Sequence, residues 1–297
     1  MARCSILILL AVLSLPAQDL LDASRSYASK RDFERAISAA QEYLKQDPQS
    51  VAGRLALGNA YFMAQRFQEA KQVARDILRS EPGEPAALEI EGNAEYLLGE
   101  VAPAINTFID LLERQPENQE APYMLGRIYY QEGRIDQAVG QFERVLRLNP
   151  RAYKALDNLG LCYQSKGDYE TATRYFLSAI KLVDKDHREY DSVYANLAEL
   201  LLNVGNAAKA FDAAAKAVDR NPYSARDFYL GGKALERLGK LDLSLNWLQR
   251  SSALDPNYPE AQYLLARVYR RLGQTDKAEK AQKKFLEVKA KAPTIRR

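Results

Sequence analysis

The sequence predicts an all-α protein, a solenoid in which one helical hairpin is repeated about eight times, and three periodic features support this fold class. A small residue recurs with spacings of 34, 34, 34, 34, 38, 34 and 34 residues, at Ala36, Ala70, Ala104, Ala138, Ala172, Ala210, Ser244 and Ala278. Twelve positions earlier a second column of small residues keeps the same register, at Ser24, Gly58, Gly92, Gly126, Gly160, Ala198, Gly232 and Ala266. Between the two columns a glycine recurs at Gly99, Gly133, Gly167, Gly205, Gly239 and Gly273. A period held this long indicates copies of one repeat, each packing only on its neighbours.

The first helix of each repeat is predicted from apolar residues spaced three and four apart, which form a stripe on one helical face. A large residue follows the earlier small column by three positions, at Tyr27, Tyr61, Tyr129, Tyr163, Leu201, Leu235 and Tyr269. Glu95 takes this place in the third repeat and is the exception. The recurring glycine ends the first helix, because glycine adopts the left-handed conformation at little cost.

The second helix carries large apolar residues such as Phe108, Phe142 and Phe176. In most repeats it ends at a proline, which cannot continue a helix. The small columns should let the two helices of a hairpin approach closely where they cross. A leucine in one of these columns should overpack the crossing, at a cost of about 1–3 kcal/mol.

This pattern resembles the tetratricopeptide repeat. The fourth repeat matches that family best, through Leu125-Gly126, Tyr129, Ala138, Phe142 and Pro150. The early tryptophan of the family does not occur in any repeat, and Trp247 falls in a second helix instead. The resemblance implies a right-handed solenoid of helical hairpins over residues 18–292, with repeats that begin at residues 17, 51, 85, 119, 153, 191, 225 and 259.

The fifth repeat carries four extra residues around Lys185–Tyr190 and lacks the terminal proline. A longer second helix or a loosened turn accounts for this insertion, and a hinge between two half-arrays is the alternative. The only histidine of the chain, His187, lies in the insertion and is expected to be an exposed loop residue.

The two ends of the sequence differ from the repeats. Residues 1–17 have the layout of a secretory signal peptide, with Arg3, an uncharged apolar stretch over Ile6–Leu15, and Pro16-Ala17 near the expected cleavage site. A buried first helix of the array is the alternative reading of this segment. Residues 293–297 are expected to form a disordered tail. The signal peptide implies an exported protein that is periplasmic or secreted, and no permanent membrane span is expected.

Composition narrows the possible functions. The chain has 42 basic and 39 acidic residues, a formal net charge of +3, which disfavours nucleic acid as the partner. A single histidine is too few for most metal sites and proton-transfer triads. No catalytic residue, metal or cofactor is therefore expected, and the protein is predicted not to be an enzyme. After cleavage Cys162 would be the one remaining cysteine, expected to be a small buried apolar residue.

In the tetratricopeptide family, first helices line a concave groove at fixed places of the repeat. Carried over place by place, the resemblance implies a protein-binding groove made of Asn59, Phe62, Asn93, Tyr96, Tyr123, Arg127, Tyr130, Arg226, Tyr229, Lys233, Arg237, Tyr263, Arg267, Arg270 and Arg271. Tyrosine and arginine are frequent anchors of protein interfaces. The lysine–asparagine clamp by which some family members grip a terminal carboxylate is not present in that form.

The function expected from these features is that of an exported scaffold or adaptor, in the bacterial cell envelope, which binds another protein or peptide. The alternative is a helical-repeat helper that binds nucleic acid or polysaccharide. Near the C-terminal repeats six cations face two carboxylates, so the partner is expected to be acidic there. Reversing the charges of Arg267 and Arg271 is expected to weaken binding and to leave stability nearly unchanged.

Overall fold

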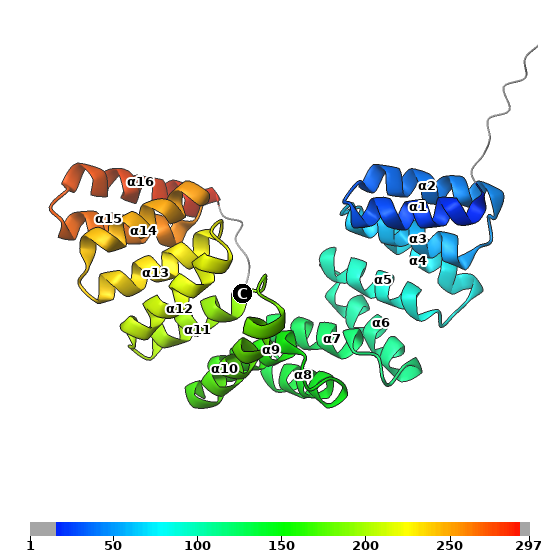
Figure 1. Cartoon of the computed structure of the whole chain (residues 1–297), viewed down its shortest axis with the longest axis horizontal. Coiled ribbons are helices and arrows are strands. Elements are labelled where there is room, and N and C mark those ends of the chain that lie inside the picture. The colour runs from blue at the N-terminus through cyan, green and yellow to red at the C-terminus, as the bar shows by residue number, and fades with distance from the viewer. Residues whose placement is uncertain (1–15, 292–297) are drawn as a thin grey trace, which may run out of the picture. The chain divides into compact units, whose positions relative to one another are not determined.

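The computed structural model describes residues 16–291, and within these residues the regular structure is entirely α-helical (Figure 1). The all-α prediction and the repeated hairpin are confirmed. The segment 1–15 of the predicted signal peptide and the predicted tail at 293–297 lie outside the described residues. The chain divides into two compact units between Ile128 and Tyr129, inside helix α7 (Glu120–Gln131).

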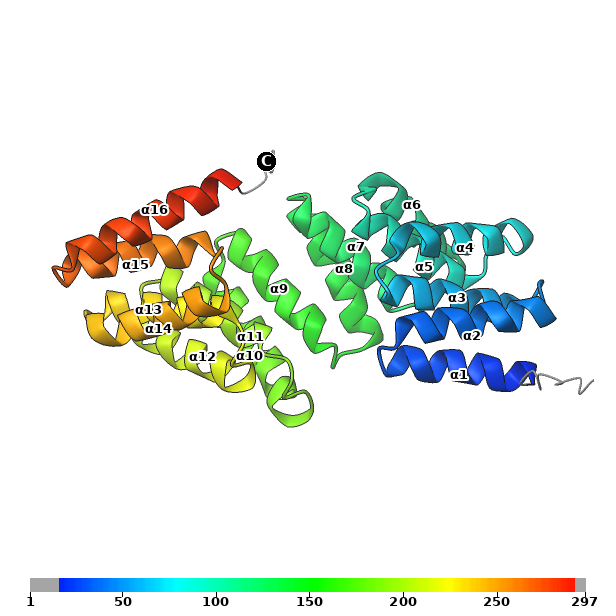
Figure 2. The same cartoon turned by 90° about the horizontal axis from the view of Figure 1, so that it is seen from above.

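The N-terminal unit contains three complete hairpins, and Figure 2 shows α1, α2, α3 and α4 as neighbouring helices. Its helices are α1 (Ala17–Ser29), α2 (Phe33–Gln46), α3 (Val51–Met63), α4 (Phe67–Ser80), α5 (Pro85–Leu97) and α6 (Val101–Arg114). The first helices α1, α3 and α5 contact one another in succession, whereas α2 and α4 each pack between two first helices. The unit is therefore a double layer with first helices on one side.

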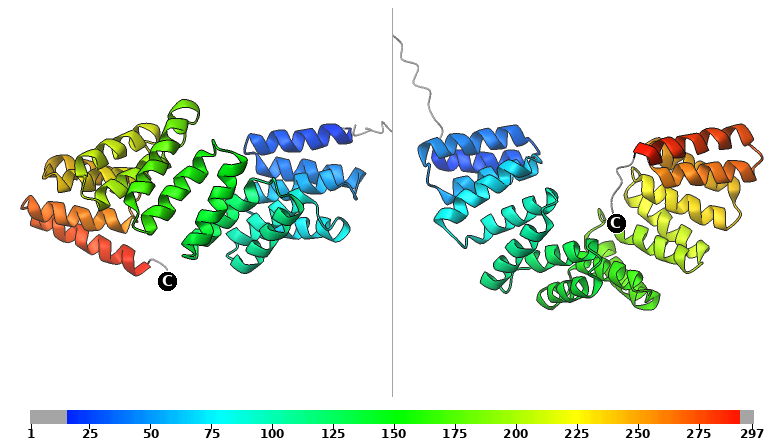
Figure 3. Two further views of the ribbon diagram at one scale, coloured as in Figure 1. Left: turned by 90° about the horizontal axis from the view of Figure 1, so that it is seen from below. Right: turned by 180° about the vertical axis from the view of Figure 1, so that it is seen from behind.

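The C-terminal unit repeats this double layer, as two further views show (Figure 3). Its helices are α8 (Ile135–Leu148), α9 (Tyr153–Ser165), α10 (Tyr169–Asp186), α11 (Ser192–Asn203), α12 (Ala207–Arg220), α13 (Ala225–Arg237), α14 (Leu241–Leu254), α15 (Pro259–Arg271) and α16 (Thr275–Lys291). The helices α9, α11, α13 and α15 contact one another in succession. We call the side formed by the first helices of either unit the first-helix face.

The crossing of each hairpin depends on its small residues. A β-carbon added at Gly160 would lie 2.4 Å from the ring of Phe176, and one at Gly92 would lie 2.9 Å from the ring of Phe108. In the seventh repeat Gly232 and Ser244 meet directly, because the Ser244 hydroxyl donates a 2.7 Å hydrogen bond to the Gly232 carbonyl. The predicted close approach is therefore present in these hairpins.

The glycine between the helices of a hairpin has a positive φ in each of the six repeats that carry it, as predicted, with values from 69° to 82°. The first two repeats make the same turn without glycine, because Arg31 has φ 62° and Gln65 has φ 60°. At Gln65 the turn closes through a 2.9 Å hydrogen bond from the Arg66 amide to the Tyr61 carbonyl. The corresponding bond after Gly99 joins Glu100 to Glu95 at 2.8 Å. The repeats therefore share the left-handed backbone conformation of this turn, and they do not all need a glycine to adopt it.

Replacing Gln65 by glycine should stabilise the protein, since the side chain is exposed and the left-handed backbone strains any other residue. We expect Gln65→Gly to raise the free energy of unfolding by about 0.5–1 kcal/mol in urea titrations followed by circular dichroism. Gly99→Gln is the matched reverse change, because no atom lies within 4 Å of an added β-carbon there, and it should destabilise the protein. A lower midpoint for Gln65→Gly would contradict this account of the turn.

The insertion in the fifth repeat lengthens its second helix, since α10 has 18 residues where α8 and α12 have 14. The longer-helix reading is confirmed. The chain divides in the fourth repeat rather than here, so the hinge alternative finds no support. His187 follows α10 as its C-cap, and its ring packs 4.2 Å from the ring centre of Tyr153, so it is less exposed than expected.

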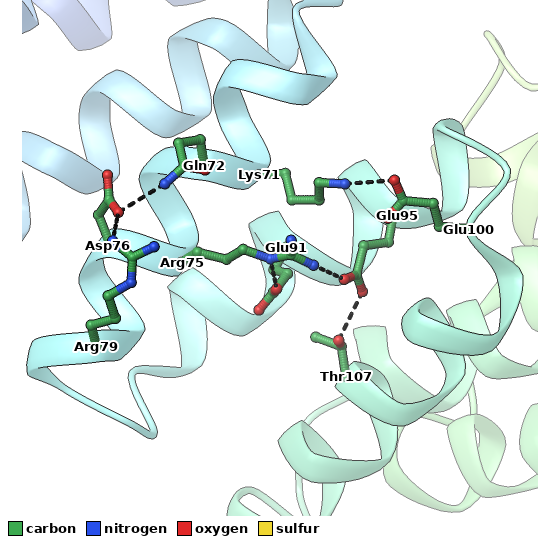
Figure 4. Close-up of polar contacts among 9 residues, drawn as sticks. All are labelled: Lys71, Gln72, Arg75, Asp76, Arg79, Glu91, Glu95, Glu100 and Thr107. Carbon is green, nitrogen blue, oxygen red and sulfur yellow. Dashed lines mark hydrogen bonds and ion pairs between the residues drawn. The ribbon is translucent and has the colours of Figure 1, made fainter.

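Glu95, the exception in the column of large residues, is buried and held by an ion-pair network in the N-terminal unit (Figure 4). Arg75 on α4 pairs with Glu95 at 2.9 Å and with Glu91 at 2.6 Å, and the Thr107 hydroxyl on α6 donates to Glu95 at 2.8 Å. Burial raises the pKa of the Glu95 carboxyl, which hydrogen bonds from Thr107 and Arg75 oppose. The network ties α4, α5 and α6 together.

Candidate functional site

The predicted groove residues of the N-terminal unit lie on first helices, but they do not share one environment. Asn59 on α3 is exposed, and with Arg25 and Leu55 it lines a hollow of about 280 Å³ between α1, α3 and α5. Phe62 is half-buried, and its ring lies 5.5 Å from that of Phe67 among core residues of the second hairpin. Phe62 is therefore a packing residue as much as a surface one.

A second group of predicted residues on this side combines aromatic rings with a guanidinium. The Arg127 guanidinium lies 5.5 Å from the centre of the Tyr96 ring, and its Nη2 is 3.5 Å from the Tyr96 hydroxyl. Asn93 and Tyr123 are half-buried. In the C-terminal unit the hydroxyl of Tyr130 lies 3.3 Å from that of Ser165.

The first-helix face of the C-terminal unit brings together most of the predicted cations, and ion pairs hold several of them. Arg267 and Arg271 on α15 both pair with Glu236 on α13, at 2.8 and 2.5 Å. Arg226 pairs with Glu199 at 2.6 Å and also donates to the Asn196 side chain at 3.0 Å. These contacts join α11, α13 and α15.

Two parts of the charge prediction need correction. Arg270 does not join the cluster, because its guanidinium donates to Gln282 on α16 at 2.9 Å. Glu199, which lies in the preceding repeat, also belongs to the cluster. Five cations therefore face Glu199, Glu236 and Glu260 rather than six facing two. The positive excess remains but is smaller than expected.

The structure changes our expectation that Arg267 and Arg271 can be reversed without loss of stability, because both side chains pair with the same carboxylate. Their common partner Glu236 has a side chain only 8 % exposed, so its carboxylate depends on the two guanidiniums. Sequence reasoning missed this because it treated each cation as an exposed residue on its own helix.

Lys233 differs from its neighbours, because within residues 16–291 it makes no ion pair. Its Nζ lies 5.6 Å from the centre of the Tyr229 ring. Partial burial lowers the pKa of Lys233, and the positive charge of Arg237 lowers it further. Arg237 itself donates to the main-chain carbonyl of Leu202 at the end of α11. Lys233 is thus a partly desolvated cation with neighbouring cations and no direct counter-ion in the described structure.

An aromatic hollow of about 400 Å³ lies next to this cation. Its lining residues are Tyr229, Pro259, Glu260, Tyr263, Phe285 and Lys289. Tyr229 and Tyr263 were predicted on this surface, whereas Phe285 and Lys289 come from the second helix α16. Sequence reasoning restricted the groove to first helices and so could not find them. The Tyr263 and Phe285 rings lie 5.5 Å apart, and Tyr263 is 48 % exposed.

A buried carboxylate connects the first helices α9, α11 and α13 of the C-terminal unit. Asp157 on α9 accepts hydrogen bonds from the Asn196 amide at 3.0 and 3.1 Å and from the Tyr190 hydroxyl at 2.7 Å. Burial raises the pKa of Asp157, while these hydrogen bonds oppose the rise. The side chain of Asn196 also accepts a hydrogen bond from Arg226, so the network helps to position the Arg226 guanidinium.

Across residues 16–291 no group of three or more His, Cys, Asp or Glu side chains is placed to hold a metal ion. In the same residues no helix has the length and apolar character needed to cross a bilayer. Cys162 is fully buried, as predicted, and burial raises the pKa of its thiol to about 12, so it carries no thiolate at neutral pH.

Asp227, in the first turn of α13, predicts a pH dependence of stability. It is buried, its Oδ2 has no hydrogen-bond partner in the described structure, and burial raises its pKa from 3.8 to about 6. Because folding favours the protonated form, this contribution to stability is complete below about pH 4 and is lost as the pH rises through about 6.

Asp227→Asn should therefore raise the free energy of unfolding at pH 8 by about 1–2 kcal/mol and change it little at pH 4. Urea titrations of the two proteins across this range check the prediction. Parallel stability curves from pH 4 to pH 8 would contradict the assignment of the raised pKa to Asp227.

Comparison with known proteins supports the fold. A tetratricopeptide repeat family matches residues 21–85, 56–120, 91–139 and 123–187, a TPR repeat family matches 232–273, and a further tetratricopeptide repeat family matches 259–291. No curated protein matches the chain. These matches cover most of the chain.

Solved structures show the same fold at low sequence identity. A tetratricopeptide repeat protein from Parabacteroides merdae is 22 % identical, with a TM-score of 0.66 over 85 % of this chain and 98 % of its own. The Cut9–Hcn1 structure of the APC/C is 20 % identical, with a TM-score of 0.72 over 82 % of this chain and 48 % of its own. The pilF structure of Pseudomonas aeruginosa is 20 % identical, with a TM-score of 0.62 over 72 % of this chain and 96 % of its own. The repeated hairpins, their turns and these matches together show that the chain belongs to the tetratricopeptide repeat family.

Proposed function

We propose that this protein is a non-enzymatic scaffold whose first-helix face binds a segment of another protein. The observation that carries the proposal is the first-helix face of the C-terminal unit. There, tyrosines and basic side chains surround a hollow of about 400 Å³. Tyrosine and arginine side chains are frequent anchors of protein interfaces.

The excess of positive charge favours a segment with acidic character. Five cations and three carboxylates share this surface, on a chain whose net charge is only +3. Such a local excess steers acidic segments toward the face and raises their association rate, more so at low salt. Single exposed pairs contribute little, so the effect depends on several cations acting together.

Photo-crosslinking in the native cells tests the proposal. A photoreactive amino acid at Asn59 or at Tyr263 should give discrete adducts with a protein partner, because both side chains are exposed on the first-helix face. The matched controls are Gln68 on α4 and Leu243 on α14, which are exposed on second helices. Equal adducts from the control positions, or adducts with nucleic acid or polysaccharide alone, would contradict the proposal.

We further propose that the scaffold is exported and acts in the bacterial envelope. The support is the basic start and the short apolar stretch of residues 1–17. We expect the native protein to begin near residue 18 and to fractionate outside the cytoplasm. A native chain that begins at Met1 or Ala2 in the cytosolic fraction would contradict export and would leave the binding proposal standing.

A further inference from the structure

The aromatic hollow of the C-terminal unit is suited to a single large apolar side chain. Its volume of about 400 Å³ is near the lower end of the range for small-molecule pockets. The rings are already in place, because Tyr229 packs edge-on against Tyr258 at 5.3 Å, and the Tyr263 ring lies tilted against that of Phe285 at 5.5 Å. A pocket with preformed walls loses little conformational freedom on binding.

The cations near the hollow differ in whether they already have an ion-pair partner. In the described structure Arg267 and Arg271 form ion pairs with Glu236, and Arg226 forms one with Glu199. Lys233 is left with the repulsion of Arg237 and Arg267 and the attraction of Glu199 and Glu260, neither of which pairs with it directly. A carboxylate of a binding partner would provide Lys233 with an ion-pair partner. At the rim of the hollow itself, Glu260 would repel such a carboxylate, whereas Lys289 on α16 would attract it.

The hollow and the cation share one side chain. Tyr229 lines the hollow, and the Nζ of Lys233 lies 5.6 Å from the centre of the same ring. Residues of an extended peptide advance by about 3.3 Å each, and side chains two positions apart point to the same side. One short segment can therefore reach both points at once.

We propose that the C-terminal unit recognises an extended peptide in which a large apolar side chain lies within two residues of a carboxylate. The apolar side chain enters the hollow between Tyr229, Tyr263 and Phe285, and the carboxylate pairs with Lys233. This inference rests on the proposed function and specifies the chemistry of the partner segment. A second copy of this chain is the competing occupant.

Selection of peptides on the full chain provides the probe. A phage library of random dodecapeptides, selected at low salt, should be enriched in peptides with Phe, Trp, Leu or Met within two residues of Asp or Glu. The best peptide is then synthesised with a fluorophore, and its binding is measured by polarisation. Replacing its acid by the amide, or its apolar residue by alanine, should weaken binding by at least about tenfold each. These changes leave the fold of the protein untouched.

Variants of the protein then locate the two contacts. Lys233→Gln should lower the affinity for the peptide by about tenfold, because it removes an attraction to the acid. Glu260→Gln should raise the affinity, because it removes a repulsion. Lys240→Gln is the matched control, an exposed lysine at the N-cap of α14, and should bind as the parent does. Melting curves by circular dichroism check that each variant is folded.

Three outcomes overturn the inference. Selected peptides without the paired apolar and acidic residues would do so, and so would equal affinities of the Lys233→Gln and Lys240→Gln variants. The third is a dimer in sedimentation velocity that Tyr263→Ala dissociates, which would place a second copy in the hollow. In the first two cases the proposed function stands if the photoreactive positions on the first-helix face still capture a partner.

Discussion

Reversing both Arg267 and Arg271 to glutamate should lower the free energy of unfolding by about 3–5 kcal/mol, because it leaves a buried carboxylate without its partners. The side chain of Glu236 is 8 % exposed, and these two guanidiniums are its ion-pair partners. The double variant would place three carboxylates together between α13 and α15. Urea titrations followed by circular dichroism measure the loss.

A matched double variant separates the local contact from the change in net charge. Arg237→Glu with Arg270→Glu changes the charge by the same amount, but these side chains donate to the Leu202 carbonyl and to Gln282 rather than to a carboxylate. We expect a loss of less than about 1 kcal/mol there. Adding Glu236→Gln to the Arg267 and Arg271 variant should recover part of the stability. Equal urea midpoints for the two double variants would show that the Glu236 contact does not stabilise the fold.

Gly160→Ala should destabilise the protein by about 1–3 kcal/mol, although alanine usually stabilises the interior of a helix. The added β-carbon would lie 2.4–2.8 Å from three atoms of the Phe176 ring, which is itself fully buried and cannot move aside. The urea midpoint of the variant measures the effect.

Gly58→Ala is the matched change in the second repeat. Its nearest atom would be Cδ1 of Ile90 at 3.3 Å, at the end of a flexible side chain, so we expect a change within about 0.5 kcal/mol of zero. Phe176→Leu should lessen the cost of Gly160→Ala, and a double-mutant cycle measures this coupling. A Gly160→Ala variant at least as stable as the parent would refute the close crossing of α9 and α10.

The periodic parts of the fold could be predicted from sequence because each repeat packs in the same way. The crossing of successive hairpins buries a small residue completely, at Ala36, Ala70, Ala104 and Ala138. Because each crossing requires a small residue, the same residue type recurs at a fixed spacing in the sequence. The positive-φ turn is different, because Arg31 and Gln65 adopt it without glycine. There the backbone hydrogen bonds of the turn outweigh the preference of the residue.

The charged contacts were predictable only in part. The repeat register predicts which cations lie on first helices, and the structure places Arg226, Arg267 and Arg271 there. Their partners Glu199 and Glu236 depend on which residues of adjacent repeats face each other, about 27 to 35 residues apart in sequence. Phe285 was missed for a related reason, since a second helix lines a hollow otherwise assigned to first helices.

Hydroxyl-radical footprinting of the complex with the selected peptide tests the central claim most directly, because it reports which side chains a bound partner covers. Tyr263 is 48 % exposed on the first-helix face, Leu243 is 51 % exposed on α14, and Tyr223 is 78 % exposed before α13. The binding proposal predicts that the peptide protects Tyr263 from oxidation and leaves Leu243 and Tyr223 as reactive as in the free protein. Protection of Leu243 with Tyr263 unchanged would place the partner on the second helices and contradict it.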